Sequence, residues 1–154
     1  MGKKKLFKQF SDKEQKHNER LARLEYGPDN VNESVRRWEG YSKKQREAIM
    51  DEGNHIYTDI VKAIEARKSP HSEDVQTLLA RWHQHIRHFY EPTTEILRGL
   101  GDLYNDNPDF AANFHKMHPD LAQYMREGIG TYVDNLETTA LQQMLDDDTK
   151  SRGA

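Results

Sequence analysis

The chain has 154 residues and a formal net charge of −3, with 34% of its residues hydrophobic and 32% charged. This length suits one domain with a core of its own, and the charge gives no field for nucleic acid, so direct nucleic-acid binding is not expected. The absence of cysteine excludes disulfides, thiolate nucleophiles and zinc–thiolate sites. No apolar run approaches the roughly 20 residues that span a bilayer and no signal peptide opens the chain, so we expect a cytoplasmic protein with no membrane contact.

The N-terminal part contains two short helical patterns. A Ser-Asp-Lys-Glu capping box opens a highly charged helix over residues 11–25. Because Leu21 and Leu24 supply nearly all of its apolar content, this helix will hardly stay folded by itself. A Tyr-Gly-Pro break follows, and a short helix over 31–39 is expected to turn Trp38 inward.

A long helix is expected from Ser42 to about Arg67. The sequence Ser-Lys-Lys-Gln at its start is a second capping box. Residues of one face recur at helical spacing along it: Ile49, Gly53, Ile56, Ile60 and Ile64. This stripe predicts a helix that packs against the core along most of its length.

The centre of the chain carries the heaviest aromatic load. Ser72 is a good N-cap, and the helix after it places apolar residues on one face: Val75, Leu78, Leu79, Trp82, Ile86, Phe89 and Tyr90. Pro92 suits the first position of a second helix that continues to Tyr104, so a corner is expected at Pro92. The two helices should meet along an apolar seam.

The C-terminal third predicts a polar turn at 105–109, a short helix around Phe114 and a last long helix with Pro119 at its first position. The packed part of that helix should end near Leu136. Gly128 and Gly130 each weaken it by roughly 1 kcal/mol relative to alanine, so a crossing helix or a ligand must approach the backbone there.

No segment has strand periodicity. We therefore expect an all-α protein of about six or seven helices joined by short turns. Residues 1–154 form a single domain in this interpretation, with an N-terminal segment (1–41), a helical body (42–136) and an extension (137–154) that ends in an acidic, disordered tail.

Three histidines lie within six residues, at His83, His85 and His88, and such a cluster could bind a metal ion. On a helical wheel, His83 and His85 flank the apolar stripe on opposite sides, so they cannot share a metal. His85 and His88 are an i, i+3 pair, but no acidic residue one turn away on that helix completes a set, and His85 is the one edge candidate for a haem ligand. Structural histidines are favoured over both sites, so no metal and no cofactor are expected. No catalytic motif is present, and an enzyme is not supported.

Aromatic residues are the remaining feature. Each can be explained by core packing, or several can line an apolar cleft with polar tips, which is the composition that small-molecule sites favour. Tyrosine suits such a cleft because it offers both a ring and a hydroxyl.

At this point the chain resembles the TipAS family, the antibiotic-recognition domain of TipA-type MerR regulators, which also occurs as free-standing proteins. The resemblance covers roughly residues 6–136 and rests on six segments in order: LFKQF, ARLEYG, SVRRWEGYSKKQ, IRHFYEP, LGDLYNDNPDF and HPDLAQYMREGI. It implies a globin-like helical fold without haem, whose N-terminal segment closes over a bulky antibiotic. The resemblance leads us to expect a stand-alone member without the DNA-binding domain of the regulators, and no cysteine is present to capture a ligand covalently. Reversible sequestration is the expected role.

We therefore expect reversible binding of a bulky hydrophobic or peptide-like antibiotic in an aromatic cleft, related to the effector domain of MerR-type regulators. The expected ligand-binding residues are Trp38, Trp82, His85, Phe89, Tyr90, Tyr104 and Tyr132. The alternative is a protein-interaction module that binds an amphipathic helix of a partner, such as a separate regulator.

Overall fold

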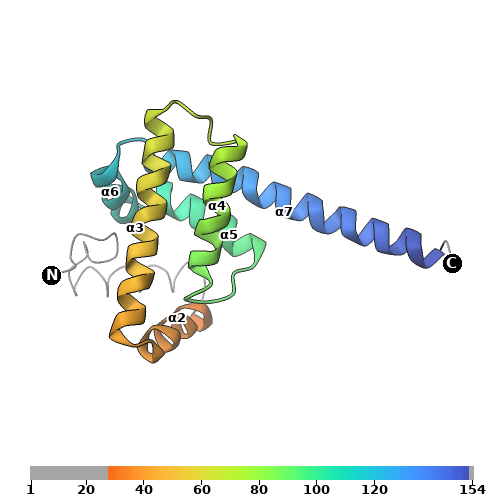
Figure 1. The fold of residues 1–154 in the computed structure, drawn as a ribbon, viewed down its shortest axis with the longest axis horizontal. Coiled ribbons are helices and arrows are strands. Elements are labelled where there is room, and N and C mark those ends of the chain that lie inside the picture. Colours follow the sequence, from red (N-terminus) through yellow and green to blue (C-terminus); the bar gives the residue numbers. More distant parts are fainter. Residues whose placement is uncertain (1–27, 153–154) are drawn as a thin grey trace.

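The computed structural model describes residues 28–152, and these residues contain helices but no strand, which confirms the all-α prediction. The helices are α2 (Pro28–Gly40), α3 (Lys43–Glu65), α4 (Glu73–Ile86), α5 (Thr94–Asp106), α6 (Pro108–Met117) and α7 (Leu121–Arg152) (Figure 1). The charged helix predicted over residues 11–25 lies outside the described residues.

Of the three serine N-caps that the sequence predicts, two lie within the described residues, and both are present. The Ser42 hydroxyl accepts a hydrogen bond from the Gln45 backbone N–H (3.1 Å), and the Gln45 side chain accepts one from the Ser42 N–H (2.8 Å), which completes the capping box. The Ser72 hydroxyl accepts from the backbone N–H of Val75. These caps fix where α3 and α4 begin, and the two helices lie side by side in opposite directions (Figure 1).

The core forms where α3, α4, α5 and α7 meet. Ile56 and Ile60 of the predicted stripe on α3 are buried there, as are Val75, Leu79 and Trp82 of the predicted face on α4. Other side chains with almost no exposed surface are Tyr57, Leu97, Leu121, Met125, Ile129 and Val133. Full burial of one such side chain stabilises the fold by about 1.5–3 kcal/mol, so these helices form a stable body.

Several helix boundaries differ from the predictions. α5 continues to Asp106 and α6 begins at Pro108, so the polar turn predicted at 105–109 is reduced to Asn107. Two other differences have a local side-chain hydrogen bond as their cause. The Thr93 hydroxyl accepts from the Ile96 N–H (3.1 Å), so Thr93 caps α5 and Pro92 precedes the helix. The His118 ring accepts from the Asp120 N–H, and Pro119 precedes α7. α4 ends at Ile86, so Phe89 and Tyr90 lie in the turn after it and not on its last face.

The two glycines of α7 have different surroundings. A Cβ at Gly128 would lie 2.8 Å from the Leu79 Cδ1 atom of α4 and 3.3 Å from the Pro70 carbonyl oxygen, so the crossing helix explains this glycine. A Cβ at Gly130 would meet nothing within 4 Å. Among the described residues, no crossing helix accounts for Gly130.

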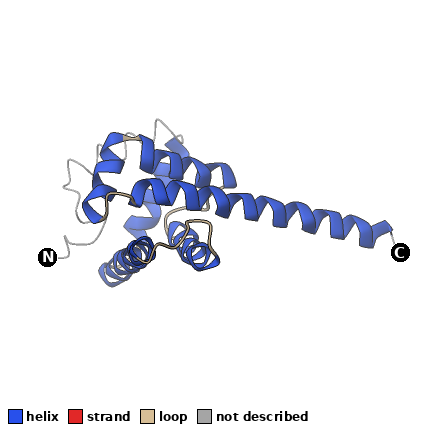
Figure 2. Ribbon diagram, turned by 90° about the horizontal axis from the view of Figure 1, so that it is seen from above, coloured by secondary structure: helices blue, strands red, loops and turns tan. Residues whose placement is uncertain are grey.

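α7 leaves the body after Leu136, as the sequence predicted, and the rest of the helix projects away from it (Figure 2). Three large apolar residues on this extension are exposed: Leu141 (58%), Met144 (68%) and Leu145 (52%). The helix continues through residues 146–148, which the sequence pattern placed in a disordered tail. Within the described residues, every helix is too short or too polar to cross a bilayer.

Candidate ligand-binding site

α2 is attached to the body differently from the other described helices. It is absent from the pairs of helices that pack closely along their lengths, which all involve α3 to α7. Val31 of α2 is buried, whereas Val35 and Trp38 are half-buried. α2 lies across the lower ends of α3 and α4 (Figure 1), so its contacts with them come mainly from side chains.

An aromatic stack joins α2 to the turn after α4. The rings of Trp38 and Phe89 lie 5.9 Å apart at 24°, and Tyr41 meets Trp38 edge-on at 6.4 Å. The ring of His85 contacts the other side of this group, 5.6 Å from Phe89 at 76°. Trp38, Tyr41 and Phe89 are each half-buried, so their rings are within reach of a ligand at the surface.

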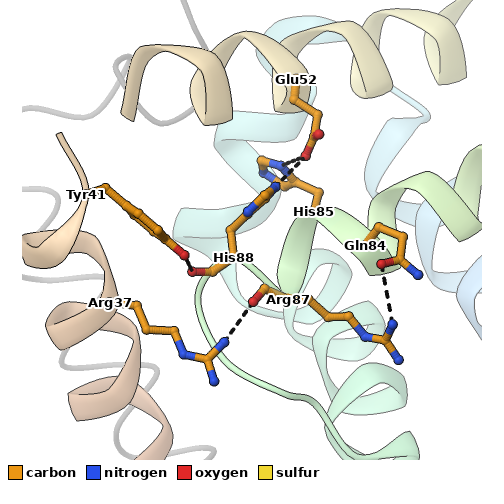
Figure 3. A network of polar contacts seen from close by, with 7 residues as sticks. All are labelled: Arg37, Tyr41, Glu52, Gln84, His85, Arg87 and His88. Carbon is orange, nitrogen blue, oxygen red and sulfur yellow. Dashed lines mark hydrogen bonds and ion pairs between the residues drawn. The ribbon is translucent and has the colours of Figure 1, made fainter. Parts of the chain in front are cut away.

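Two hydrogen bonds also join α2 and the residue after it to backbone carbonyls at the C-terminal end of α4. The Tyr41 hydroxyl donates to the His88 carbonyl (2.6 Å), and an Arg37 guanidinium N–H donates to the Arg87 carbonyl (2.8 Å) (Figure 3). Carbonyls at the end of a helix lack intrahelical donors, so α2 satisfies groups that α4 leaves open.

Arg46 of α3 contacts the C-terminal end of α2. Its side chain donates to the carbonyls of Trp38 (2.9 Å) and Glu39 (3.2 Å), and its guanidinium carbon lies 5.5 Å from the centre of the Trp38 ring. A cation over an indole face contributes roughly 0.5–1 kcal/mol at an exposed site. We call the group formed by Arg37, Trp38, Tyr41, Arg46 and Phe89 the α2 junction.

Trp82 and Tyr104 lie apart from this junction, in the core. Trp82 is completely buried and meets Tyr104 edge-on at 6.4 Å, while Tyr104 contacts Phe114 at 4.7 Å. Burial raises the pKa of the Tyr104 hydroxyl well above its usual value, and the pKa of Tyr57 rises for the same reason. The indole N–H of Trp82 makes no hydrogen bond of good geometry within the described residues.

The remaining expected ligand residues have separate surroundings. Tyr132 of α7 forms a 2.8 Å hydrogen bond with Nδ1 of His83, on the side of α4 opposite His85. Tyr90 is half-buried against the core, and burial raises the pKa of its hydroxyl to about 12. Among the seven expected residues, the structure brings together Trp38, His85 and Phe89 at one place and Trp82 with Tyr104 at another.

A polar group that the sequence did not predict lies beside the α2 junction. Glu52 of α3 directs one carboxylate oxygen, Oε1, to 2.9 Å from Nδ1 of His85 and 3.2 Å from Nε2 of His88 (Figure 3). Burial lowers the pKa of His85, because the charged imidazolium is disfavoured there more than the Glu52 carboxylate favours it.

Glu52 was missed because the acidic partner was sought on the histidines' own helix. His83 and His85 do face opposite sides of α4, as predicted. The residues Arg37 and Tyr41 were also missed as contacts, although both stand in the SVRRWEGYSKKQ segment that carries the family resemblance. No pattern within one helix reveals either contact, because each joins residues about 47 to 50 positions apart.

Comparison with known proteins supports the resemblance. A family model described as the TipAS antibiotic-recognition domain matches residues 7–132. The HTH-type transcriptional activator mta of Bacillus subtilis is 30% identical over 142 residues, which are 89% of this chain and 54% of that protein. The HTH-type transcriptional regulator SkgA of Caulobacter vibrioides is 26% identical over 138 residues, 86% of this chain and 54% of that protein. The chain thus spans about half the length of the curated relatives it matches.

A solved structure shows the same fold. TipAS from Streptomyces lividans, determined in complex with nosiheptide in work on a thiopeptide antibiotic multidrug resistance system, matches with a TM-score of 0.72 at 23% identity. The match covers 84% of this chain and 90% of that one. The likeness confirms the globin-like helical fold that the sequence predicted.

Proposed function

Because the chain belongs to the TipAS antibiotic-recognition domain family, we propose that it binds a bulky hydrophobic or peptide-like antibiotic reversibly and thereby sequesters it. The observation that carries this proposal is the family match over residues 7–132, which includes both the N-terminal segment and the helical body. The composition supports reversible binding, because a chain without cysteine offers no thiol for covalent capture.

The proposed binding place is the α2 junction, between α2 and the turn after α4. Trp38 and Phe89 supply half-buried rings there, and His85 lies directly behind Phe89. Half-buried aromatic rings with polar groups beside them suit a ligand that is apolar in bulk and polar at its edges. Tyr90 follows Phe89 directly in the chain and is proposed to extend this wall. Tyr132, Trp82 and Tyr104 lie apart from the α2 junction.

The proposed lid is the N-terminal segment up to residue 41, of which the structure describes α2. Its attachment by one ring stack and a few hydrogen bonds supports this role, because such contacts contribute about 0.5–1.5 kcal/mol each and can be exchanged for contacts with a ligand. Ordering a segment on binding lowers affinity but lets one site enclose ligands of different shape.

Titration of the protein with nosiheptide, followed by calorimetry, tests the proposal. Binding to the unmodified chain is expected, and Trp38→Ala should weaken it at least tenfold, because an aromatic residue at the centre of an interface carries much of the binding energy. Trp38→Phe keeps an aromatic ring, so its affinity for nosiheptide should lie between those of the unmodified chain and Trp38→Ala.

Met144→Ala serves as the control, because Met144 is exposed on the extension far along α7. Equal affinity for nosiheptide in Trp38→Ala and the unmodified chain would move the binding place away from the α2 junction. Absence of binding by nosiheptide and by other bulky antibiotics would favour the alternative, in which the site takes an amphipathic helix of a protein partner.

A further inference from the structure

Glu52, His85 and His88 are placed so that they could bind one metal ion. One donor atom from each residue lies within 4.8 Å of the other two, and two of the separations are shorter, at 2.9 and 3.2 Å. Two imidazole nitrogens and one carboxylate oxygen are a donor set that Zn²⁺ uses when it keeps one position open for water.

We propose that Glu52, His85 and His88 bind a single Zn²⁺ ion. The spacing supports this assignment, because zinc bonds of about 2.0–2.2 Å in a tetrahedral arrangement put neighbouring donors about 3.4 Å apart. The carboxylate oxygen of Glu52 already lies close to that distance from both histidines.

The three donor side chains differ in how freely they can move. One fixed donor and two movable donors suit a site that is partly formed before the ion binds. His85 is fixed, since its side chain is 1% exposed and its ring packs against Phe89. Glu52 and His88 have side chains that are 44% and 37% exposed, so they can adjust to the ion. Their exposure also provides the route for the ion and room for a water molecule as the fourth ligand.

A bound ion would change how α2 is held. It would join α3 to the turn after α4, where the His88 carbonyl accepts a hydrogen bond from the Tyr41 hydroxyl (Figure 3). Phe89 of the same turn stacks on Trp38. We expect zinc to stabilise the α2 junction for this reason. The proposal does not depend on antibiotic binding and is tested without any antibiotic.

The test uses the complete chain without an affinity tag, treated with a chelator and then titrated with Zn²⁺ alone by calorimetry. The expected result is one ion per chain, with affinity reduced at least tenfold in Glu52→Gln and in His88→Gln. Both positions are exposed or half-exposed, so these variants should fold, which circular dichroism verifies. His115→Gln is the matched control, because His115 is exposed on α6 and outside the group.

A second measurement does not rely on any variant. Zinc should shift the imidazole ¹⁵N resonances of His85 and His88 and leave that of His115 unchanged, and Co²⁺ in place of zinc should give the intense visible absorption of a four-coordinate site. The proposal is overturned if the unmodified chain shows no saturable binding of Zn²⁺. It is equally overturned if Glu52→Gln and His88→Gln bind zinc as tightly as the unmodified chain.

Discussion

The helical body and the α2 junction are held by different interactions. In the body, whole side chains such as Ile60 and Trp82 are removed from water, and each contributes a few kcal/mol. At the α2 junction, half-buried rings and hydrogen bonds to helix-end carbonyls contribute about 0.5–1.5 kcal/mol apiece. This difference supports the proposal that the body is a permanent scaffold and that α2 can detach from it and bind to it again.

Removing Trp82 should have the largest effect on stability. Trp82→Ala leaves a large cavity in the core and should lower the free energy of unfolding by about 3–5 kcal/mol, measured by urea denaturation. A loss below about 1 kcal/mol, together with a large loss of antibiotic affinity, would place Trp82 in the wall of the ligand site instead.

Removing Trp38 should affect α2 and spare the body. Trp38→Ala abolishes the stack with Phe89 and the contact with Arg46, so α2 should become sensitive to limited proteolysis. The free energy of unfolding of the body should fall by only about 1–2 kcal/mol, because Trp38 is half-buried. A loss as large as that of Trp82→Ala would show that α2 is an integral part of the core.

The two glycines of α7 test the packing of the body more finely. Gly130→Ala should raise the free energy of unfolding by up to about 1 kcal/mol, because alanine favours helix and nothing occupies the space. Gly128→Ala gains the same helix propensity but forces Leu79 and the segment at Pro70 to move, so it should be less stable than Gly130→Ala by about 1–2 kcal/mol. Equal thermal melts of the two variants would contradict the described crossing of α4 and α7.

A substitution on the exposed extension of α7 should have the smallest effect on the free energy of unfolding. Met144→Ala removes a side chain that is 68% exposed, and the free energy of unfolding should change by no more than about 0.5 kcal/mol. A larger loss in the same urea denaturation would mean that the extension is covered in solution.

Features that depend on neighbouring residues in the sequence were predictable. The caps at Ser42 and Ser72 and the stripe through Ile56 and Ile60 are local or periodic, and the structure confirms them. The end of packing near Leu136 follows from the same periodicity. Together they gave the all-α fold and most of the core.

Features that depend on how helices dock were not predictable. Glu52 approaches His85 and His88 only because α3 and α4 lie side by side, and no pattern on α4 indicates it. The same limit explains why Gly128 and Gly130, two residues apart with the same propensity, have opposite surroundings. For the same reason, the sequence did not show that Trp82 and Tyr104 lie in the core whereas Trp38 and Phe89 lie at the α2 junction.

Amide hydrogen exchange of the free protein and of its mixture with nosiheptide tests the central claim most directly. We predict that α2 exchanges much faster than α4 and the packed part of α7 in the free protein, because it buries little surface and packs closely along no other described helix. Nosiheptide should then slow exchange in α2 while leaving the body nearly unchanged. Exchange in α2 that is as slow as in α4 without ligand, and unchanged with it, would contradict a releasable lid.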